Sequence, residues 1–141
     1  MPNIKIRKQS FLIGFFIYFL LGTVSAQSNG PNGVSKVIFF DYDAYVVKPE
    51  FENSIKAHAD FLIANPNLKV SIEAHTEDNG GYEYNLSLAQ KRAKAVTNIL
   101  LKLGVLSVQI ESVAFGSVKP AVEGNDEAAW AKNRRVEFFY R

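Results

Sequence analysis

The chain has 141 residues, a formal net charge of +2 and no cysteine. This length accommodates one compact domain and a short leader. The lack of cysteine excludes disulfides, thiol catalysis, cysteine-ligated metals and an N-terminal lipidated cysteine.

Residues 1–26 have the pattern of a signal peptide. A basic start and an apolar run of about a dozen residues precede the small-x-small cleavage pattern Val24-Ser25-Ala26. We expect cleavage after Ala26; the alternative is an uncleaved anchor, although so short a run hardly spans ~30 Å of hydrocarbon.

Three of the 16 basic residues and none of the 14 acidic ones lie in this leader, which leaves residues 27–141 with a net charge of −1. A nucleic-acid binder would need a net basic surface, so this class is disfavoured.

The first half of the remaining chain contains a linker, a strand and a helix. Residues 27–35 are polar and glycine-rich, which predicts a flexible linker before a domain at 36–141. The β-branched and aromatic segment 34–41 predicts a strand. A helix is expected from Pro49 to about Asn65, because apolar or aromatic side chains recur there at helical spacing: Phe51, Ile55, His58 and Leu62. We interpret His58 as a hydrogen-bonded, partly buried histidine rather than a ligand.

The second half repeats the alternation of strand and helix. Residues 70–75 alternate as a strand with one buried face, and a glycine-containing loop follows. The next helix is expected to start near Asn85 or Ser87, which has capping-box spacing to Gln90, and to end before Gly104. Its predicted apolar stripe consists of Ala89, Ala93, Val96, Leu100 and Leu103. The chain is expected to continue with a strand at 109–115 and a short helix at 126–132. It should end in a strand that carries Val136, Phe138 and Tyr140 on one face.

This β-α-β-α-β-α-β order predicts an α+β fold. Most strands alternate between apolar and polar residues, so helices should cover one face of the sheet and leave the other largely open. We therefore expect a two-layer α/β sandwich with a four-stranded mixed sheet.

The candidate binding chemistry lies where the strand at 70–75 passes into the loop and the next helix. Free backbone N–H groups collect at such a helix start and favour anions. Arg92, about two turns into that helix, presents a guanidinium fork, and Glu77 supplies the opposite charge. Together they suit a zwitterionic ligand; the alternatives are that they pair with each other or that Arg92 is a solvated charge.

Other chemistries are less well supported. Asp41 and Asp43 have the spacing to bind a cation, but acids at a strand end are more often turn formers, and only His75 lies nearby. No metal site and no cofactor are therefore expected. Glu73 and Glu77 are conceivable as glycosidase carboxylates, but nothing places an acid of raised pKa in a deep cleft. We expect a protein that is not an enzyme.

Several segments in register resemble the OmpA-like peptidoglycan-binding domain, and within it most closely the peptidoglycan-associated lipoproteins (Pal). The resemblance covers roughly residues 37–140. Its motifs are Phe40-Asp41-Tyr42-Asp43, Ile72-Glu73-Ala74-His75-Thr76-Glu77, Tyr84-Asn85 with Leu88 and Lys91-Arg92-Ala93, Phe115-Gly116 with Pro120, and the segment 126–136.

The resemblance implies non-catalytic binding of the peptidoglycan stem peptide, chiefly its diaminopimelate. In the family an aspartate and an arginine hold that zwitterion, and their roles correspond here to Glu77 and Arg92. The family's other contacts correspond to Tyr42, Asp43, Asn79 and Leu88. Pal-type proteins also engage Tol proteins such as TolB, so these are implied partners.

Two departures from the family pattern matter. Glu77 stands where the family has aspartate, one methylene shorter, which puts diaminopimelate selectivity in question. The lipidated cysteine of Pal is missing, so no direct lipid anchor is expected, and the implied location is a Gram-negative periplasm, with attachment to the outer membrane or wall through partners. The alternative function is a protein-interaction adaptor, of the Tol-Pal type or in a motility or secretion complex, with weakened or lost affinity for peptidoglycan.

Overall fold

The computed structural model describes residues 29–141; the expected signal peptide at 1–26 and the first two residues of the expected linker lie outside this part of the chain. The elements are β1 (Val37–Phe39), η1 (Pro49–Phe51), α1 (Glu52–Ala64), β2 (Val70–His75), α2 (Tyr82–Lys102), η2 (Ser107–Gln109), β3 (Ile110–Gly116), α3 (Glu127–Asn133) and β4 (Arg135–Tyr140). Within residues 29–141, no helix has the length and apolar character needed to cross a membrane.

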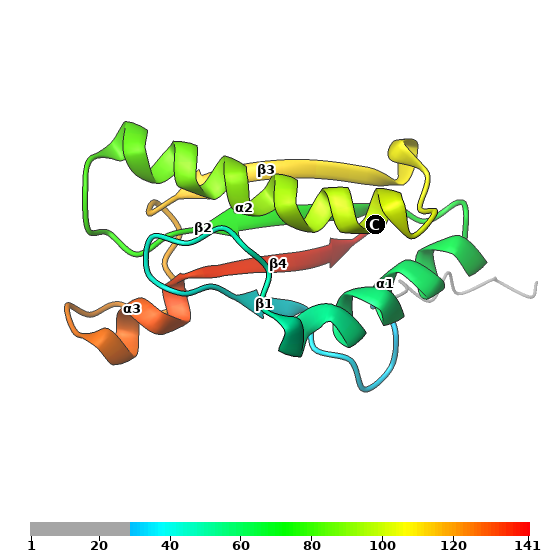
Figure 1. The fold of residues 1–141 in the computed structure, drawn as a ribbon, viewed down its shortest axis with the longest axis horizontal. Helices are drawn as coiled ribbons and strands as arrows, with labels where there is room; N and C mark the ends of the chain where they lie inside the picture. The colour runs from blue at the N-terminus through cyan, green and yellow to red at the C-terminus, as the bar shows by residue number, and fades with distance from the viewer. Residues whose placement is uncertain (1–28) are drawn as a thin grey trace, which may run out of the picture.

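The four strands form one mixed sheet in the order β1-β4-β2-β3. β4 pairs antiparallel with both β1 and β2, whereas β2 and β3 run parallel. Helices α1 and α2 lie across the same face of this sheet, and α3 lies at one end, beside the start of β4 (Figure 1). The predicted two-layer α+β architecture is therefore confirmed.

The core fills the space between the sheet and the two long helices. Its members have the spacing that the sequence predicted, every second residue on the strands and every third or fourth on the helices. They include Ile38, Val70, Ile72, Ala74, Val136 and Phe138 from the sheet, and Ile55, Leu62, Ala89, Val96 and Leu100 from the helices. Leu103, which we expected in the same stripe, is 41% exposed because it caps α2 and precedes Gly104, where the chain turns away with a φ of +103°.

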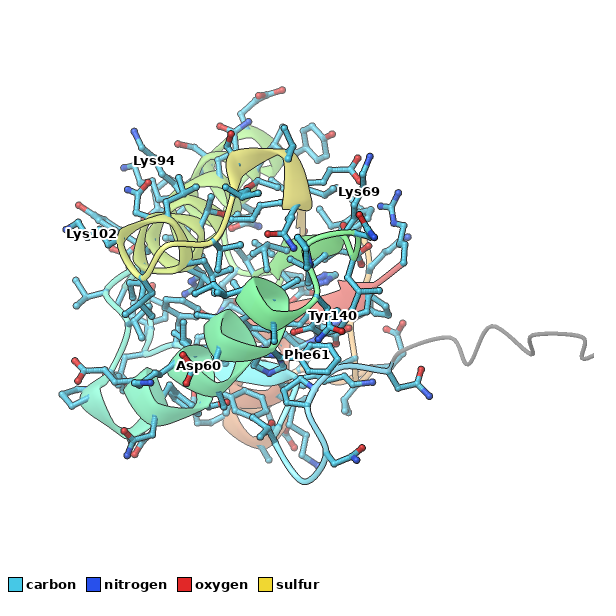
Figure 2. The ribbon with its side chains drawn as sticks, turned by 90° about the vertical axis from the view of Figure 1, so that its right-hand side faces the viewer. Asp60, Phe61, Lys69, Lys94, Lys102 and Tyr140 are labelled. Carbon is cyan, nitrogen blue, oxygen red and sulfur yellow. The ribbon has the colours of Figure 1, made fainter. Side chains whose placement is uncertain are left out.

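His58 has the structural role that its position predicted. It is fully buried; its Nε2 donates to the carbonyl of Ser35 at 2.9 Å, and its Nδ1 accepts from the Tyr140 hydroxyl at 2.6 Å. Figure 2 shows Tyr140 beside Phe61, whose ring meets it edge-on at 5.5 Å. A Cβ on Gly30 would lie 2.6 Å from the Tyr140 ring, so the described part of the expected linker contacts the domain.

Three local expectations were wrong. β1 is shorter than the predicted segment 34–41, although backbone bonds from Phe40 to Arg134 and from Phe138 to Lys36 continue the pairing beyond its ends. α2 begins at Tyr82, with Gly81 at the N-cap, several residues before the expected start. Finally, both faces of β2 are buried, because the strand is central in the sheet and side chains of its neighbours pack on it, as Phe115 of β3 does on His75.

Candidate functional site

The six residues singled out for binding line one hollow at the end of the sheet where β2 passes into α2. They come from three separate segments: the loop after β1, the loop after β2 and the first half of α2. The hollow is shallow, with an accessible volume of about 20 Å³. It is lined by Tyr42, Asp43, Glu77, Asn79, Leu88 and Arg92, together with Thr76, Tyr84 and Asn85. We refer to it as the first hollow.

Arg92 is the most buried charge of the first hollow, with no exposed surface. Its Nε donates to the carbonyl of Ala44 at 2.8 Å, Nη1 to His75 at 3.0 Å and Nη2 to Asp41 at 3.2 Å. Arg92 therefore fastens the loop after β1 to the end of β2, and it is neither a solvated helix charge nor hydrogen-bonded to Glu77. Burial, and secondly the positive charge of Arg134, lower the pKa of Arg92 to about 10.

Glu77 pairs with a residue that we had not connected to it. Its Oε2 accepts from Arg134 Nη1 at 2.9 Å, and both side chains are nearly buried. The same guanidinium donates to Glu127 at 2.7 Å and to the carbonyl of Phe40 at 3.1 Å. The carboxylate of Glu127, and to a smaller degree that of Glu77, raises the pKa of Arg134. In turn, the hydrogen bond from Arg134 lowers the pKa of Glu127.

The loop after β1 is held in a fixed shape at the mouth of the first hollow. Asp43 adopts a left-handed backbone with a φ of +52° and accepts a hydrogen bond from the Tyr84 hydroxyl. Asp41 instead forms an ion pair with Lys48 at 3.3 Å, so the two acids point to different partners. Within residues 29–141, no three metal-ligating side chains gather into a cluster.

Three residues of the first hollow were missed as contacts in the sequence: Thr76, Tyr84 and Asn85. The last two lie in α2 because this helix starts at Tyr82, and there they share a face with Leu88 and Arg92. An earlier helix start, with Gly81 as the N-cap, would have identified both. Thr76 is buried, and its hydroxyl oxygen has no hydrogen-bond partner among residues 29–141.

The arrangement leaves binding capacity of both signs. A guanidinium has five N–H groups, and three hydrogen bonds to carbonyls are recorded for Arg92, so two of its N–H groups have no recorded partner within residues 29–141. Arg134 occupies one oxygen of Glu77, and the other can accept from a ligand ammonium. The lining of the first hollow therefore offers hydrogen-bonding groups suited to a ligand that carries both charges.

Comparison with known proteins connects this geometry to a family. The OmpA family matches residues 39–134. The chain is 44% identical to a peptidoglycan-associated lipoprotein of Pasteurella multocida over 73% of its own length and 69% of that protein. The chain is 38% identical to the Haemophilus influenzae protein of the same name, over 84% of its own length and 82% of that protein. For the Pseudomonas putida protein, the chain spans only 59% of its length.

Solved structures give the same picture. The crystal structure of the peptidoglycan-associated lipoprotein from Burkholderia pseudomallei superposes with a TM-score of 0.75 at 40% identity, and covers 76% of this chain and 91% of that one. The C-terminal domain of Helicobacter pylori MotB superposes with a TM-score of 0.70, over 76% of this chain and 84% of that domain. Its identity is 21%, which shows a shared fold alone.

Proposed function

Because the chain belongs to the OmpA family, we propose that it binds peptidoglycan non-covalently in the cell envelope and that the first hollow takes the diaminopimelate of the stem peptide. The observation that carries this proposal is the convergence of Arg92 and Glu77, with spare hydrogen-bonding capacity of opposite sign, in one hollow. The names of the similar proteins, peptidoglycan-associated lipoproteins, support the same ligand.

The structure suggests how Glu77 can replace the family's aspartate. In this chain the carboxylate of Glu77 accepts a hydrogen bond from Arg134. Arg134 also donates to Glu127 and to the carbonyl of Phe40, and these two acceptors fix its position. The proposed binding mode keeps Arg134 in place, so that Glu77 holds the ligand ammonium with its second oxygen while Arg92 donates to the ligand carboxylate. Charge-assisted hydrogen bonds of this kind contribute about 1.5–3 kcal/mol each.

The proposed setting is the periplasm, without catalysis. Because the chain has no cysteine, the lipid attachment that the relatives' names indicate is not part of the proposal. Attachment to the outer membrane or wall through partners, Tol proteins such as TolB among them, is an extension of it.

Co-sedimentation with purified sacculi tests the proposal. We expect the parent protein to sediment and Glu77→Gln to remain mostly in the supernatant. Glu73→Gln is the matched control, because Glu73 lies on β2 but outside the first hollow, and it should sediment like the parent. Circular dichroism establishes that each variant is folded.

The remaining outcomes separate the alternatives. If the parent protein itself stays in the supernatant, wall binding is wrong and the adaptor function takes its place. If Glu77→Gln sediments as well as the parent, the assignment of the site is wrong. Release of soluble fragments from the sacculi would identify an enzyme.

A further inference from the structure

A second hollow adjoins the first one along α2. It has an accessible volume of about 150 Å³ and is lined by Asp43, Tyr45, Tyr84, Ser87, Leu88 and Lys91. Three of these residues, Asp43, Tyr84 and Leu88, also line the first hollow. The two hollows are therefore neighbours with a common wall. A ligand has to extend by only a few residues, at about 3.5 Å per extended residue, to reach from one to the other.

The walls of the second hollow are held in place. Residues Tyr84, Ser87, Leu88 and Lys91 follow one another along one side of α2. The opposite wall is the loop after β1, which Arg92 holds through the carbonyls of Asp41 and Ala44 on either side of Asp43. The hydrogen bond from Tyr84 to Asp43 joins the two walls directly. Such a site needs little ordering when a ligand binds.

The second hollow is lined by exposed aromatic rings, hydrogen-bond donors and hydrogen-bond acceptors. Tyr45 is 46% exposed and Tyr84 is 53% exposed. Lys91 Nζ lies 5.3 Å from the centre of the Tyr45 ring, and within residues 29–141 no ion pair or hydrogen bond is recorded for it. Lys91 thus offers donors, the Asp43 carboxylate offers acceptors, and the Ser87 hydroxyl offers both.

This combination fits an uncharged ring that carries several hydroxyl groups. The apolar face of a sugar ring can stack on a tyrosine while its hydroxyls use donors and acceptors at the edge. A second ligand carboxylate fits less well, because the Asp43 carboxylate lines the same hollow as Lys91 and would repel it.

We propose that the second hollow is a saccharide subsite, which holds a sugar ring of the glycan next to the stem peptide bound in the first hollow. The inference rests on the proposed function, since it assumes that the stem peptide occupies the first hollow. It adds that the protein recognises the sugar and peptide parts of its ligand together.

Calorimetry with two defined ligands tests this inference: a stem tetrapeptide that contains diaminopimelate, and the same tetrapeptide attached to its disaccharide. We expect the parent protein to bind the disaccharide form about threefold to tenfold more tightly, the range expected for one good aromatic contact. Tyr45→Ala and Lys91→Gln should lose most of this gain while keeping the parent's affinity for the tetrapeptide. Neither Tyr45 nor Lys91 lines the first hollow.

Matched controls come from the same helix. Tyr82 is 59% exposed and lines neither hollow, and Lys94 points to the outer edge of the molecule (Figure 2). Tyr82→Ala and Lys94→Gln should therefore retain the full gain from the disaccharide.

Every other outcome of the calorimetry would contradict the proposed subsite. The subsite is overturned if the parent binds both ligands equally, or if Tyr45→Ala and Lys91→Gln keep the gain. It is also overturned if these variants lose affinity for the tetrapeptide alone to the same degree, because the two residues would then act by shaping the loop. If the parent binds neither ligand, the proposed function fails and the subsite fails with it.

Discussion

Arg92 combines two roles at a single position, because the same guanidinium that faces the first hollow also closes the structure around it. Three backbone carbonyls accept from it, and none of its surface is exposed. Replacing it by lysine keeps the charge but removes the planar fork, so buried carbonyls lose their donors at about 1–3 kcal/mol each.

We therefore expect Arg92→Lys to lower the free energy of unfolding by roughly 2–4 kcal/mol in urea denaturation. Arg141→Lys is the matched control. Arg141 is exposed and pairs with Glu111 at the surface, where such pairs contribute about 1 kcal/mol or less. Equal losses in the two variants would contradict the role of Arg92 as a clamp.

His75, at the end of β2, makes stability depend on pH. Its ring is 2% exposed and stacks on Phe115 with ring centres 5.3 Å apart. Burial first, then the charge of Arg135, lower its pKa from 6.5 to about 4. The charge of Lys119 acts in the same direction, whereas the charge of Glu137 and the backbone of Lys119 act in the opposite one. The unfolded chain therefore binds a proton at a higher pH than the folded one, and acid favours unfolding.

From this shift we expect the free energy of unfolding to fall by about 1.5 kcal/mol between pH 6.5 and pH 5, because the slope rises towards 1.36 kcal/mol per pH unit only once the unfolded imidazole is protonated. His75→Phe, which keeps a ring against Phe115, should show a shallower slope in urea titrations over this range. Some slope should remain, because burial also lowers the pKa of His58. An unchanged slope in the variant would show that His75 does not titrate in this way.

At the scale of elements, α2 lies close against the end of β3 at Gly116. Gly116 has a φ of +61°, and a Cβ there would lie 3.2 Å from the backbone nitrogen of Leu86 and 3.3 Å from the carbonyl carbon of Asn85. A glycine at this position lets the helix that carries Leu88 and Arg92 lie directly against the sheet.

Gly116→Ala should consequently destabilise the protein by roughly 2–4 kcal/mol, the sum of left-handed backbone strain and contact with α2. Gly33→Ala isolates the first of these effects. Gly33 has a similar φ of +73°, but among the described residues 29–141 nothing lies within 4 Å of an added Cβ. A loss of about 1–2 kcal/mol in the free energy of unfolding is therefore expected. Thermal unfolding of the two variants measures the difference, and equal losses would show that the approach of α2 is unimportant.

The extent of α2 illustrates what sequence patterns can predict about an element. The apolar spacing of Ala89, Ala93, Val96 and Leu100 predicted the buried face correctly, because packing against the sheet requires that period. The start was wrong because Ser87 and Gln90 have capping-box spacing by chance inside the helix. The actual N-cap, Gly81, has no side chain that could mark it.

At the scale of the whole molecule, the pairing of Glu77 with Arg134 depends on strand order. The two residues are 57 positions apart, and they meet because β4 lies between β1 and β2. Alternation along a strand indicates which face a residue occupies but not which strand is its neighbour. The sequence could therefore nominate Glu77 and Arg92, yet it could not identify the third charge.

The first hollow is built by three segments that converge only in the folded chain, so its ligand should stabilise the whole fold. A ligand at a hundredfold excess over its Kd adds about 2.7 kcal/mol to the free energy of unfolding. For a domain of this size that corresponds to a rise in Tm of roughly 8–15 °C.

We expect the diaminopimelate tetrapeptide to raise the Tm of the parent protein and of Glu73→Gln by equal amounts. In Glu77→Gln the rise should be much smaller at the same ligand concentration, because one charged contact is missing. The same rise in all three proteins would mean that the tetrapeptide binds elsewhere, since stabilisation by a ligand follows its affinity for the folded state.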